Sequence, residues 1–395
     1  MKFVFSTTLA LALLATAPAL ADGRIDVMTQ NQYLGADLNP IIAAPNPPAF
    51  NAAVLQALSQ IAANDFETRA GLLARLIAGR IPDLVGLQEV FKFECRPIAP
   101  PPPSGGCNDP SIAGAFNDHL ARTMEKLDAL GENYAVVATV ENLKIGLPVD
   151  TNLDGDFDIL VDVLDRDVIL ASEAVEASAT VVNYSAFCTG RTAADGCNYF
   201  VVAEADTALG PIKQQRGWVG IDVTVDGTDY RFVNTHLEVQ RPDPTNPLSP
   251  FIQAAQSAEL IGVLGASTPP EKTLIVVGDI NSSSEDPVIP GPLPPLPPPF
   301  DQGIVPPYTQ LVASGYTDAW TLVGQIPGFS CCQKSDLSNQ RSILDERIDV
   351  IFSREMPTKA KKKRVLGDNI PDKSAPKGLW PSDHGSVAAE LEFEN

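Results

Sequence analysis

Residues 274–281 constrain the fold of this chain more than any other stretch of its sequence. The first four, Leu-Ile-Val-Val, are apolar and mostly β-branched, which is typical of a strand buried on both faces. Gly278 ends the run and, having no Cβ, lets another backbone or a ligand approach closely. Asp279 and Asn281 follow two residues apart, so a continuing strand presents both on one face, where they suit a water, a phosphate oxygen or a hard cation. A turn capped by an Asp or Asn side chain is the alternative explanation.

Five further hydrophobic stretches of the chain end in the same way, with side chains that can bind a metal or a phosphate. Each has a structural explanation of its own, such as a hairpin edge, a strand cap or a polar turn, but their joint occurrence indicates one shared site. Two of the three histidines fall at these positions, whereas His119 lies on a predicted helix and is expected as a surface or packing residue. In chain order the five stretches end at Asn31, Gln88-Glu89, Asn234-Thr235-His236, Arg347-Ile348-Asp349 and Ser382-Asp383-His384.

Strands and helices alternate along the chain, with antiparallel hairpin signals among strands that are joined by helices. We therefore expect one α/β domain, residues 22–395, built of two packed sheets flanked by helices, with surface inserts near residues 95–110 and 287–307. The Asp226-Gly227 pair predicts a tight hairpin turn. Predicted strands cover residues 24–31, 84–89, 134–140, 159–163, 168–171, 180–184, 199–203, 218–225, 230–235 and 387–393. Predicted helices begin near residue 64, with Asn64 or Asp65 as N-cap, and cover 111–130 and 251–264, while 39–48 is expected as a loop.

In this combination and order, the polar motifs resemble those of the endonuclease/exonuclease/phosphatase superfamily. That superfamily includes pancreatic-type DNases, abasic-site endonucleases, inositol polyphosphate phosphatases and secreted bacterial sphingomyelinases. The Gly-Asp-x-Asn element at 278–281 and the Ser-Asp-His element at 382–384 carry the resemblance, which spans residues 25–393. It implies a DNase-like four-layer α/β sandwich, in which two packed mixed sheets are flanked by helices and the active site lies at one end of the sheets.

The resemblance also implies a divalent-metal site, with Glu89 as the principal ligand supported by Asn31 and Asp383. A phosphodiester repels an anionic nucleophile, so a hydrolase must neutralise charge at the reacting phosphate, which a divalent ion held by carboxylates does. Because the donors are hard oxygens, the expected ion is Mg²⁺, with Mn²⁺ or Ca²⁺ as alternatives.

Five further residues are given catalytic roles by the resemblance. Asp279 would orient or deprotonate the attacking water, and Asn281 would hold that water or a phosphate oxygen. His236 would bind a non-bridging phosphate oxygen. His384, paired with the carboxylate of Asp349, would stabilise the transition state or protonate the leaving oxygen, since a histidine beside a carboxylate stays protonated near neutral pH.

The expected function is therefore that of a secreted, divalent-metal-dependent phosphodiester hydrolase, with an extracellular nuclease as the first choice. A sphingomyelinase-like or phosphomonoesterase-like hydrolase is the alternative within the superfamily, so the substrate is a nucleic acid or a phospholipid headgroup. A non-catalytic extracellular binding protein is the alternative outside it. The chain has 28 basic and 49 acidic residues, a net charge of −21, which argues against tight, sequence-independent binding to a phosphate backbone but does not exclude turnover at a metal site.

Residues 1–21 have the pattern of a cleavable secretory signal peptide. Lys2 supplies the positive charge, residues 9–14 the apolar core, and Ala19-Leu20-Ala21 the small-residue cleavage site. No later run is long and apolar enough to cross a bilayer. The expected product is a monomer released to the periplasm or the medium.

The six cysteines fall into three local pairs: Cys95/Cys107, Cys188/Cys197 and Cys331/Cys332. With an export signal, an even number of cysteines indicates disulfides, although six cysteines allow fifteen pairings. A bond between the adjacent Cys331 and Cys332 is expected to be strained, because consecutive Cα atoms lie closer together than a disulfide prefers.

Three weaker signals lie outside these motifs. Residues 150–158 place oxygen donors at alternate positions before Gly155, as in an EF-hand calcium loop, but Val161 stands where that loop needs a glutamate. Calcium binding and a solvated acidic turn both remain open there. Arg166 would contact phosphate or pair with its neighbours Asp165 and Asp167. The basic run at 359–364 is expected as an exposed loop that could also steer an anionic substrate.

Overall fold

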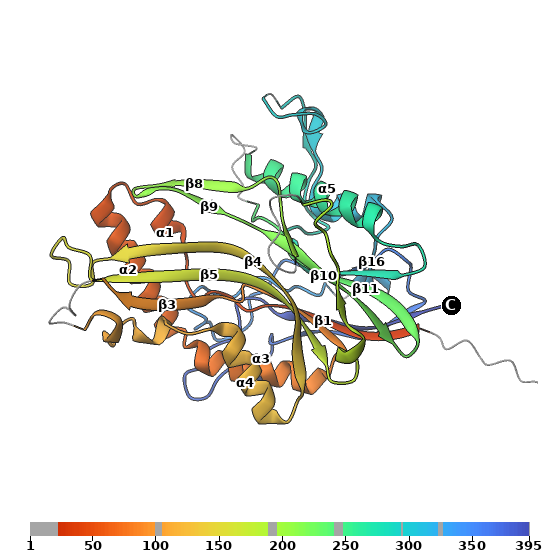
Figure 1. Ribbon diagram of the computed structural model, residues 1–395, viewed down its shortest axis with the longest axis horizontal. Helices are drawn as coiled ribbons and strands as arrows, with labels where there is room; N and C mark the ends of the chain where they lie inside the picture. Colours follow the sequence, from red (N-terminus) through yellow and green to blue (C-terminus); the bar gives the residue numbers. More distant parts are fainter. Residues whose placement is uncertain are drawn as a thin grey trace, which may run out of the picture.

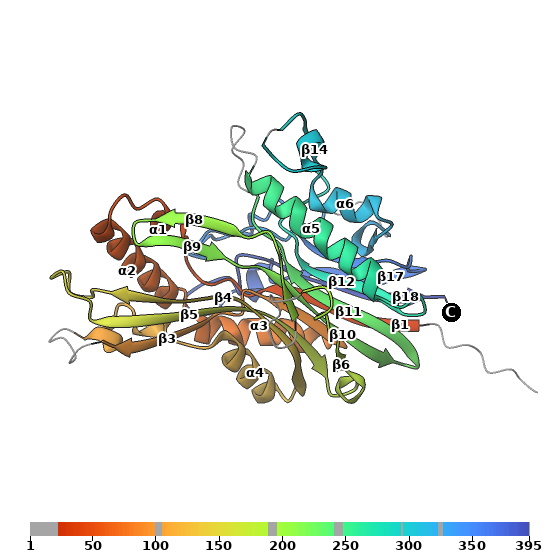
Figure 2. The same cartoon turned by 45° about the horizontal axis from the view of Figure 1, so that its top comes forward.

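In the computed structural model, the chain is described over residues 23–98, 105–188, 196–240, 248–293, 295–322 and 327–394. The predicted signal peptide, residues 1–21, lies outside the described residues. Two seven-stranded sheets form the middle of the molecule and pack face to face, with helices on their outer faces (Figures 1 and 2). Among the described residues, no helix combines the length and the apolar character that a bilayer span needs.

The first sheet contains both ends of the described chain. Its strands lie in the order β17-β18-β1-β2-β5-β3, and β4 also pairs with β5. β1 and β2 run parallel, and the other neighbours run antiparallel. The bounds are β1 (Gly23–Asn31), β2 (Leu84–Gln88), β3 (Lys92–Pro97), β4 (Tyr134–Val149), β5 (Ile159–Ser172), β17 (Lys359–Leu366) and β18 (Ser386–Phe393).

The second sheet is built around the apolar run with which the sequence analysis began. Its strands lie in the order β15-β16-β12-β11-β10-β6, and β7 also pairs with β10. β11 and β12 run parallel, and the other neighbours run antiparallel. The bounds are β6 (Thr180–Val181), β7 (Gly196–Asn198), β10 (Gly217–Val225), β11 (Thr228–His236), β12 (Thr273–Asp279), β15 (Thr317–Asp318) and β16 (Asp349–Ser353).

Three hydrophobic clusters define the layers. One lies between the sheets and joins residues such as Ile25 and Leu84 to Val219 and Ile275. A second packs α3 (Phe66–Arg80) and α4 (His119–Leu130) on the first sheet, and a third packs α5 (Leu248–Ser267) and α6 (Pro307–Ala313) on the second. The order is helix, sheet, sheet, helix, so the predicted four-layer α/β sandwich is confirmed.

The remaining elements lie outside the four layers of this sandwich. α1 (Asn39–Ile42) and α2 (Pro47–Ala63) lie beside the outer half of β4 and β5, next to a separate two-stranded sheet of β8 (Ala203–Thr207) and β9 (Gly210–Gln214) (Figure 1). A second small sheet, β13 (Ile289–Pro290) and β14 (Gly303–Ile304), projects from the side that carries α5 (Figure 2). The short 3₁₀ helices are η1 (Gly106–Asn108), η2 (Ala113–Ala115), η3 (Glu176–Ser178), η4 (Phe300–Gln302), η5 (Ala319–Leu322) and η6 (Ile370–Asp372).

The helix predictions were correct in part. The helix expected near residue 64 is α3, whose N-cap is Asp65, and the one expected at 251–264 is α5. The helix predicted from residue 111 begins only at His119, because the Asp118 carboxylate accepts the backbone N–H groups of Leu120 and Ala121 and caps it there. The loop predicted at 39–48 is wrong, since it contains α1 and the start of α2, whose first residue is Pro47.

Three predictions about strands and loops differ from the structure. The two strands expected at 159–163 and 168–171 are one continuous strand, β5, and the strand expected at 199–203 is replaced by β7 before it and β8 after it. The basic run at 359–364 is not a loop but part of the edge strand β17. Its Lys361 and Lys362 pair with Glu392 and Glu390 of β18, so much of its charge is neutralised. Charged edges of this kind hinder pairing with another chain.

All three local cysteine pairs are bonded. Cys95–Cys107 joins β3 to η1, Cys188–Cys197 joins Cys188 to β7, and the adjacent Cys331 and Cys332 are bonded to each other.

Candidate active site

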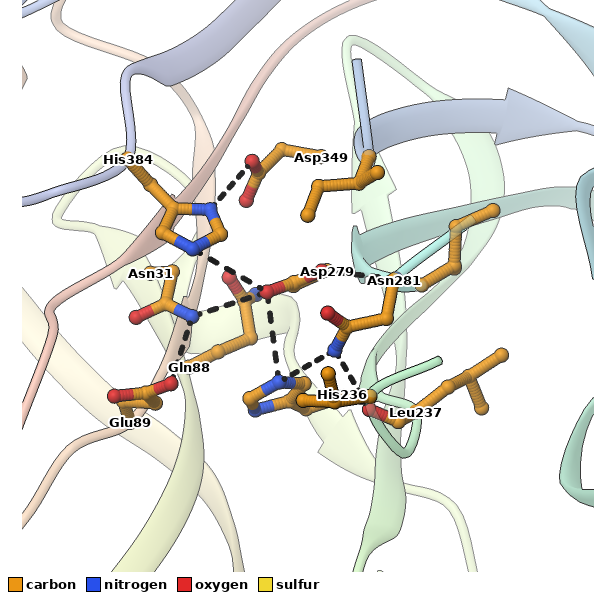
Figure 3. Close-up of polar contacts among 12 residues, drawn as sticks. Asn31, Gln88, Glu89, His236, Leu237, Asp279, Asn281, Asp349 and His384 are labelled. Atoms are coloured by element: carbon orange, nitrogen blue, oxygen red, sulfur yellow. Dashed lines mark hydrogen bonds and ion pairs between the residues drawn. The ribbon is translucent and has the colours of Figure 1, made fainter. Parts of the chain in front are cut away.

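The candidate site lies where the carboxyl ends of parallel strands meet. Asn31 ends β1 opposite Gln88 of β2, and His236 ends β11 opposite Asp279 of β12. β16 runs antiparallel to β12, so its first residue, Asp349, pairs with Asp279. Because parallel strands end at the same edge of a sheet, the two sheets present these groups at one end of the sandwich. Figure 3 shows the side chains pointing toward one another.

Two glycines allow the close backbone approach on which this arrangement depends. A Cβ on Gly278 would lie 1.9 Å from the carbonyl oxygen of Thr235 on β11, and the φ of Gly278 is +147°. A Cβ on Gly86 would lie 2.6 Å from the side chain of Val277, across the interface between the sheets. The close approach predicted for Gly278 is thus present, and Gly86 allows a similar close approach between the two sheets.

Asn281 is held by a turn and not by a continuing strand. β12 ends at Asp279, and Asn281 has φ +49°, in the left-handed region. Its backbone N–H donates to Oδ1 of Asp279 at 2.9 Å, which is the capped turn considered as the alternative. The amide nitrogen of Asn281 then donates to the carbonyl of Leu237 at 2.9 Å and lies 3.2 Å from Nε2 of His236.

Asp279 is the centre of the cluster. Its Oδ2 accepts a hydrogen bond from Nδ2 of Asn31 at 3.1 Å and lies 3.5 Å from Nε2 of His236 and 3.8 Å from Nε2 of His384 (Figure 3). Burial raises the pKa of Asp279 to about 7; the charge of His384 opposes this rise and the charge of Asp349 adds to it. A carboxyl group with this pKa can both accept and release a proton near neutral pH.

His384 is held between carboxylates. Its Nδ1 donates to Oδ2 of Asp349 at 2.8 Å, and its Nε2 faces Asp279 and, at 4.0 Å, Oδ1 of Asp383. Burial alone would lower the pKa of His384, but Asp349, Asp383 and Asp279 together raise it well above its usual value of 6.5. His384 is therefore an imidazolium at neutral pH, with a proton on Nε2 that points into the site.

His236 has the opposite protonation state. Nη1 of Arg216 lies 2.9 Å from Nδ1 of His236 and can only donate, so Nδ1 is the acceptor and the ring proton sits on Nε2, facing Asp279. Burial lowers the pKa of His236 well below its usual value, and the positive charge of Arg216 lowers it further. The site thus pairs a neutral imidazole with a charged one.

Arg216 was not among the predicted site residues, although the sequence contained the signal for it. The Asp226-Gly227 turn sets the register of the β10–β11 hairpin, which places Gly217 opposite His236. Counting back from the turn therefore puts Arg216 beside the histidine. The guanidinium is buried and also lies 3.7 Å from Oδ2 of Asp165, whose pKa burial raises to about 7.

Arg166 contacts other residues than its neighbours Asp165 and Asp167. Its Nη2 donates to Oδ1 of Asp118 at 2.5 Å, and its Nε donates to the carbonyl of Val90 at 3.0 Å. Alternation along β5 explains the difference, since Asp165 and Asp167 point to one face, where they are buried, and Arg166 points to the other.

The three predicted metal ligands lie in the same region. Nδ2 of Asn31 donates to Oε1 of Glu89 at 3.2 Å, while Oδ1 of Asn31 accepts the backbone N–H of Tyr33. Oε2 of Glu89 accepts the N–H of Leu34 at 2.9 Å. Burial raises the pKa of Asp383 to about 7; His384 opposes the rise, and the charge of Glu89 adds to it. Both carboxylates line one cavity.

The donor chemistry fits a hard divalent cation. Within the described residues, two groups bring three donor atoms close enough to bind an ion: Asp279, Asp349 and His384, and Cys331, Cys332 and His384. The second group is unsuitable because the sulfurs are bonded to each other and are not thiolates. His384 is protonated, which leaves carboxylate oxygens as the donors, and Oδ1 of Asp349 is buried with no hydrogen-bond partner in the described part of the chain. Oxygen donors of this kind suit Mg²⁺, Mn²⁺ or Ca²⁺.

All eight predicted site residues belong to one connected cluster. Asp279 contacts Asn31 and both imidazoles, Asn31 continues to Glu89, and His384 continues to Asp349 and Asp383. The eight residues are Asn31, Glu89, His236, Asp279, Asn281, Asp349, Asp383 and His384. They come from positions along the whole described chain, so the cluster exists only in the folded protein.

Two other sequence signals lie outside the cluster. The Asp150 carboxylate accepts the backbone N–H groups of Leu153 and Gly155, and Asp158 accepts that of Thr151, so these carboxylates stabilise their own turn. His119 is buried and stacked on Phe66, with ring centroids 3.5 Å apart, which confirms it as a packing residue.

Neither a protein-family model nor a curated protein sequence matches the chain. Solved structures that match include an endonuclease/exonuclease/phosphatase from Beutenbergia cavernae (18% identity, 94% of this chain and 72% of that chain covered, TM-score 0.47) and a protein of the same family from Bacteroides thetaiotaomicron (15%, 95% and 99%, 0.48). D. rerio TDP2 complexed with a single-strand DNA product also matches (13%, 94% and 99%, 0.44). The first two structures are of the family that the sequence motifs resemble, and the similarity is one of fold.

Proposed function

We propose that this chain is a member of the endonuclease/exonuclease/phosphatase superfamily and hydrolyses phosphoric esters with the help of a bound divalent cation. One observation carries the proposal. The Asp279 carboxyl, with a pKa of about 7, lies within 3.8 Å of two imidazoles in opposite states, neutral His236 and protonated His384. A base, a neutral donor and an acid around one point are the groups that hydrolysis of a phosphate ester needs.

Asp279 is the proposed general base. A water held between its carboxylate and the Asn281 amide can give a proton to Oδ2 while its oxygen attacks the phosphorus. The raised pKa of Asp279 makes it a stronger base than an ordinary aspartate.

His384 is the proposed general acid. The imidazolium gives its Nε2 proton to the leaving oxygen as the phosphorus–oxygen bond breaks, and Asp349 keeps the ring oriented through Nδ1. One turnover leaves Asp279 protonated and His384 neutral. Since Oδ2 and Nε2 are 3.8 Å apart, the proton can return from one to the other and reset the site.

His236 and Asn281 are the proposed phosphate-binding groups. His236 offers a proton on Nε2 that Arg216 keeps in place, and neither group carries a negative charge that would repel the substrate. Donors fixed before the reaction stabilise the charge that develops on the phosphoryl oxygens.

Glu89, Asn31 and Asp383 would hold the cation. When bound, it would neutralise the phosphate charge and polarise the reacting phosphorus–oxygen bond. Asn31 now donates to the carboxylates of both Glu89 and Asp279 and so keeps them close together. We also propose, from the signal-peptide pattern and the disulfides, that the enzyme acts outside the cytoplasm.

The test is hydrolysis of bis(p-nitrophenyl) phosphate by the purified mature chain. We expect turnover with Mg²⁺, Mn²⁺ or Ca²⁺ that EDTA abolishes. Asp279→Asn and His384→Gln should each lower kcat by about 10²–10⁴-fold. Asp222→Asn is the matched control. It changes a carboxylate in the middle of β10 that pairs with Arg231 outside the cluster, and it should keep kcat. A chain that turns over no phosphoric ester with any of these ions would favour the non-catalytic binding protein.

A further inference from the structure

A cavity of about 610 Å³ opens beside the catalytic cluster. Glu89, Asp165, Arg216 and Asp383 line the end next to the site, and Tyr33 lies beside them. The volume is in the range of pockets that bind small organic ligands. The cavity is therefore large enough to hold a part of the substrate that the chemistry itself does not use.

The floor of the cavity becomes apolar with distance from the site. On β5, alternate residues face it in the order Asp165, Val163, Val161, from charged to apolar. Val163 pairs with Ile145 of β4 and Phe93 of β3, which gives an unbroken apolar row across three strands. Alternation fixes this face, so the gradient follows from the strand sequences themselves.

The facing walls show the same gradient. Along β9 and the residues that follow it, Ile212, Gln214 and Arg216 line the cavity and become more polar toward the site. α1 and α2 close the far end with the apolar side chains of Ile41 and Val54. Figure 2 shows these helices and the β8–β9 sheet beside the outer half of β4 and β5. The cavity is thus charged at one end and apolar at the other.

The apolar part is not sealed by its own side chains. Leu34, Ile41, Ile145, Leu147 and Ile212 are only partly buried, although all of them line the cavity. Apolar surface that lines a cavity and stays in contact with water marks a binding site for an apolar ligand.

A nucleic-acid strand does not suit this cavity. Arg216 is the one cation among the described lining residues, and it is already engaged with His236 and Asp165. Acidic lining residues, Asp37 among them, would repel further phosphates, and affinity for a nucleic-acid backbone needs several free Lys or Arg contacts.

We propose that the substrate is a lipid-like phosphodiester, whose phosphate lies at Asp279 and whose alkyl chain occupies this cavity. The inference rests on the proposed hydrolase function and names its substrate class. The phosphate lies next to the charged end, where Glu89 and Asp383 would hold the cation, and the apolar end removes the chain from water.

The proposal is tested with a series of p-nitrophenyl alkyl phosphates that share one leaving group and carry ethyl, hexyl or decyl chains. They are used as monomers, with a parallel arm in which a long-chain phospholipid is presented in vesicles. We expect kcat/KM to rise with chain length, by up to about fourfold per methylene until the cavity is filled. A rise with monomeric esters shows a chain site in the protein, whereas a preference confined to vesicles would place the chain in the membrane and overturn the proposal.

Cavity variants separate this site from the catalytic cluster. Ile145→Asn and Leu147→Asn place an amide on the cavity floor and should flatten the dependence on chain length while the ethyl ester is hydrolysed as before. Val136→Asn is the matched control, because Val136 lies on the same strand, is 41% exposed and is not a lining residue. It should keep the full dependence.

Besides a preference confined to vesicles, three results would overturn the inference. They are kcat/KM independent of chain length, unchanged chain-length dependence in Ile145→Asn and Leu147→Asn, and plasmid DNA cleaved with higher kcat/KM than the decyl ester. Binding of decyl phosphate and ethyl phosphate, measured by calorimetry, decides the question independently of turnover. If no ester is hydrolysed, the hydrolase proposal fails. Tighter binding of the decyl compound, lost in Ile145→Asn, would still support the chain site, and equal binding would refute it.

Discussion

His236 and His384 both face the carboxylate of Asp279, and their surroundings give the two rings different protonation states. Arg216 donates to Nδ1 of His236 and keeps that ring neutral, whereas Asp349 accepts from Nδ1 of His384 and helps to keep that ring charged. Burial and the charge of Arg216 lower the pKa of His236, whereas Asp349, Asp383 and Asp279 together raise that of His384. We therefore propose that Arg216 is a positioning residue that acts through His236.

Replacement of Arg216 by lysine tests this role. Lysine keeps the positive charge but not the planar geometry that reaches Nδ1 of His236, so the proton should distribute over both ring nitrogens. We expect kcat for bis(p-nitrophenyl) phosphate to fall by about 10–100-fold, since the Nε2–H donor is then present only part of the time. The ¹⁵N chemical shifts of the His236 ring report the tautomer directly. An unchanged single Nε2–H tautomer in Arg216→Lys would contradict the role.

His119, the third histidine, makes the free energy of unfolding depend on pH. Burial lowers the pKa of His119 well below 6.5, and the nearby charges of Arg69 and Arg166 lower it further. Below pH 6.5 the unfolded chain binds a proton that the folded chain does not bind, so this contribution to stability is present above pH 6.5 and is lost as the pH falls. Between pH 7.5 and 5.5 the loss is about 1.4 kcal/mol.

The measurement is urea unfolding at the two pH values for wild type and for His119→Phe. Phenylalanine keeps the stack on Phe66 and cannot titrate. The free energy of unfolding should fall by about 1.4 kcal/mol less in the variant than in wild type. All other groups titrate in both proteins, so they cancel in the comparison. Equal falls would mean that His119 is protonated in the folded state.

The positions of the candidate site residues at strand ends were predictable where a local sequence pattern indicated them. Six of the eight predicted side chains end, follow or begin apolar strands, and Asp383 and His384 lie just before β18. The register of parallel strands brings the strand ends together. Arg216 was missed because it stands before its strand, next to a partner twenty residues away in the chain. The contacts of Arg166 with Asp118 and Val90 depend on how α4 packs beside β5, which no local pattern specifies.

At the scale of elements, the sequence interpretation was wrong at two prolines and at two charged residues. Pro47 and Pro48 suggested a loop, yet proline is favoured in the first turn of a helix, and α2 begins there. Asp165 and Asp167 seemed to interrupt a strand, yet β5 continues through them, because Asn142 and Arg216 lie next to their buried carboxylates. In each case a tertiary partner outweighed the local preference.

The turn from β12 into the site gives a prediction for Gly278. Gly278→Ala places a Cβ 1.9 Å from the Thr235 carbonyl at a φ that alanine avoids, so β11 and β12 must move apart. We expect the free energy of unfolding in urea to fall by at least about 3 kcal/mol. Gly262→Ala is the control, because Gly262 lies in α5 with no atom within 4 Å of its added Cβ. That variant should gain about 0.5–1 kcal/mol. Similar small effects in both would show that the strand pair is not packed as described.

At the scale of the whole molecule, polar contacts across the sheet interface hold the site together. Asn31 of the first sheet donates to Asp279 of the second, and Asn234 of the second sheet donates to the carbonyls of Leu87 and Val168 in the first. Gly86 allows this approach. The overall sandwich was predictable from apolar alternation, but the contacts between the sheets were not, since they depend on how two separate sheets are placed on each other.

Because the carboxylates gather only when the sheets are packed, a cation that they bind stabilises the folded chain and not the unfolded one. The expected gain in the free energy of unfolding is about 2.7 kcal/mol when free Mg²⁺ is a hundred times its Kd. Urea unfolding with and without Mg²⁺, at ionic strength matched with NaCl, measures it without any assay of activity. Glu89→Gln should lose most of the gain, since it removes the charge that faces Asn31.

Asp154→Asn separates the candidate site from the acidic turn at 150–158. If Mg²⁺ binds at Glu89, this variant keeps the full gain, because Asp154 belongs to the exposed turn and not to the cluster. The same comparison with Ca²⁺ decides whether the turn binds calcium. A gain that disappears in Asp154→Asn and persists in Glu89→Gln would move the cation to the turn. The cluster at the end of the sheets would then need another source of positive charge to bind a phosphodiester.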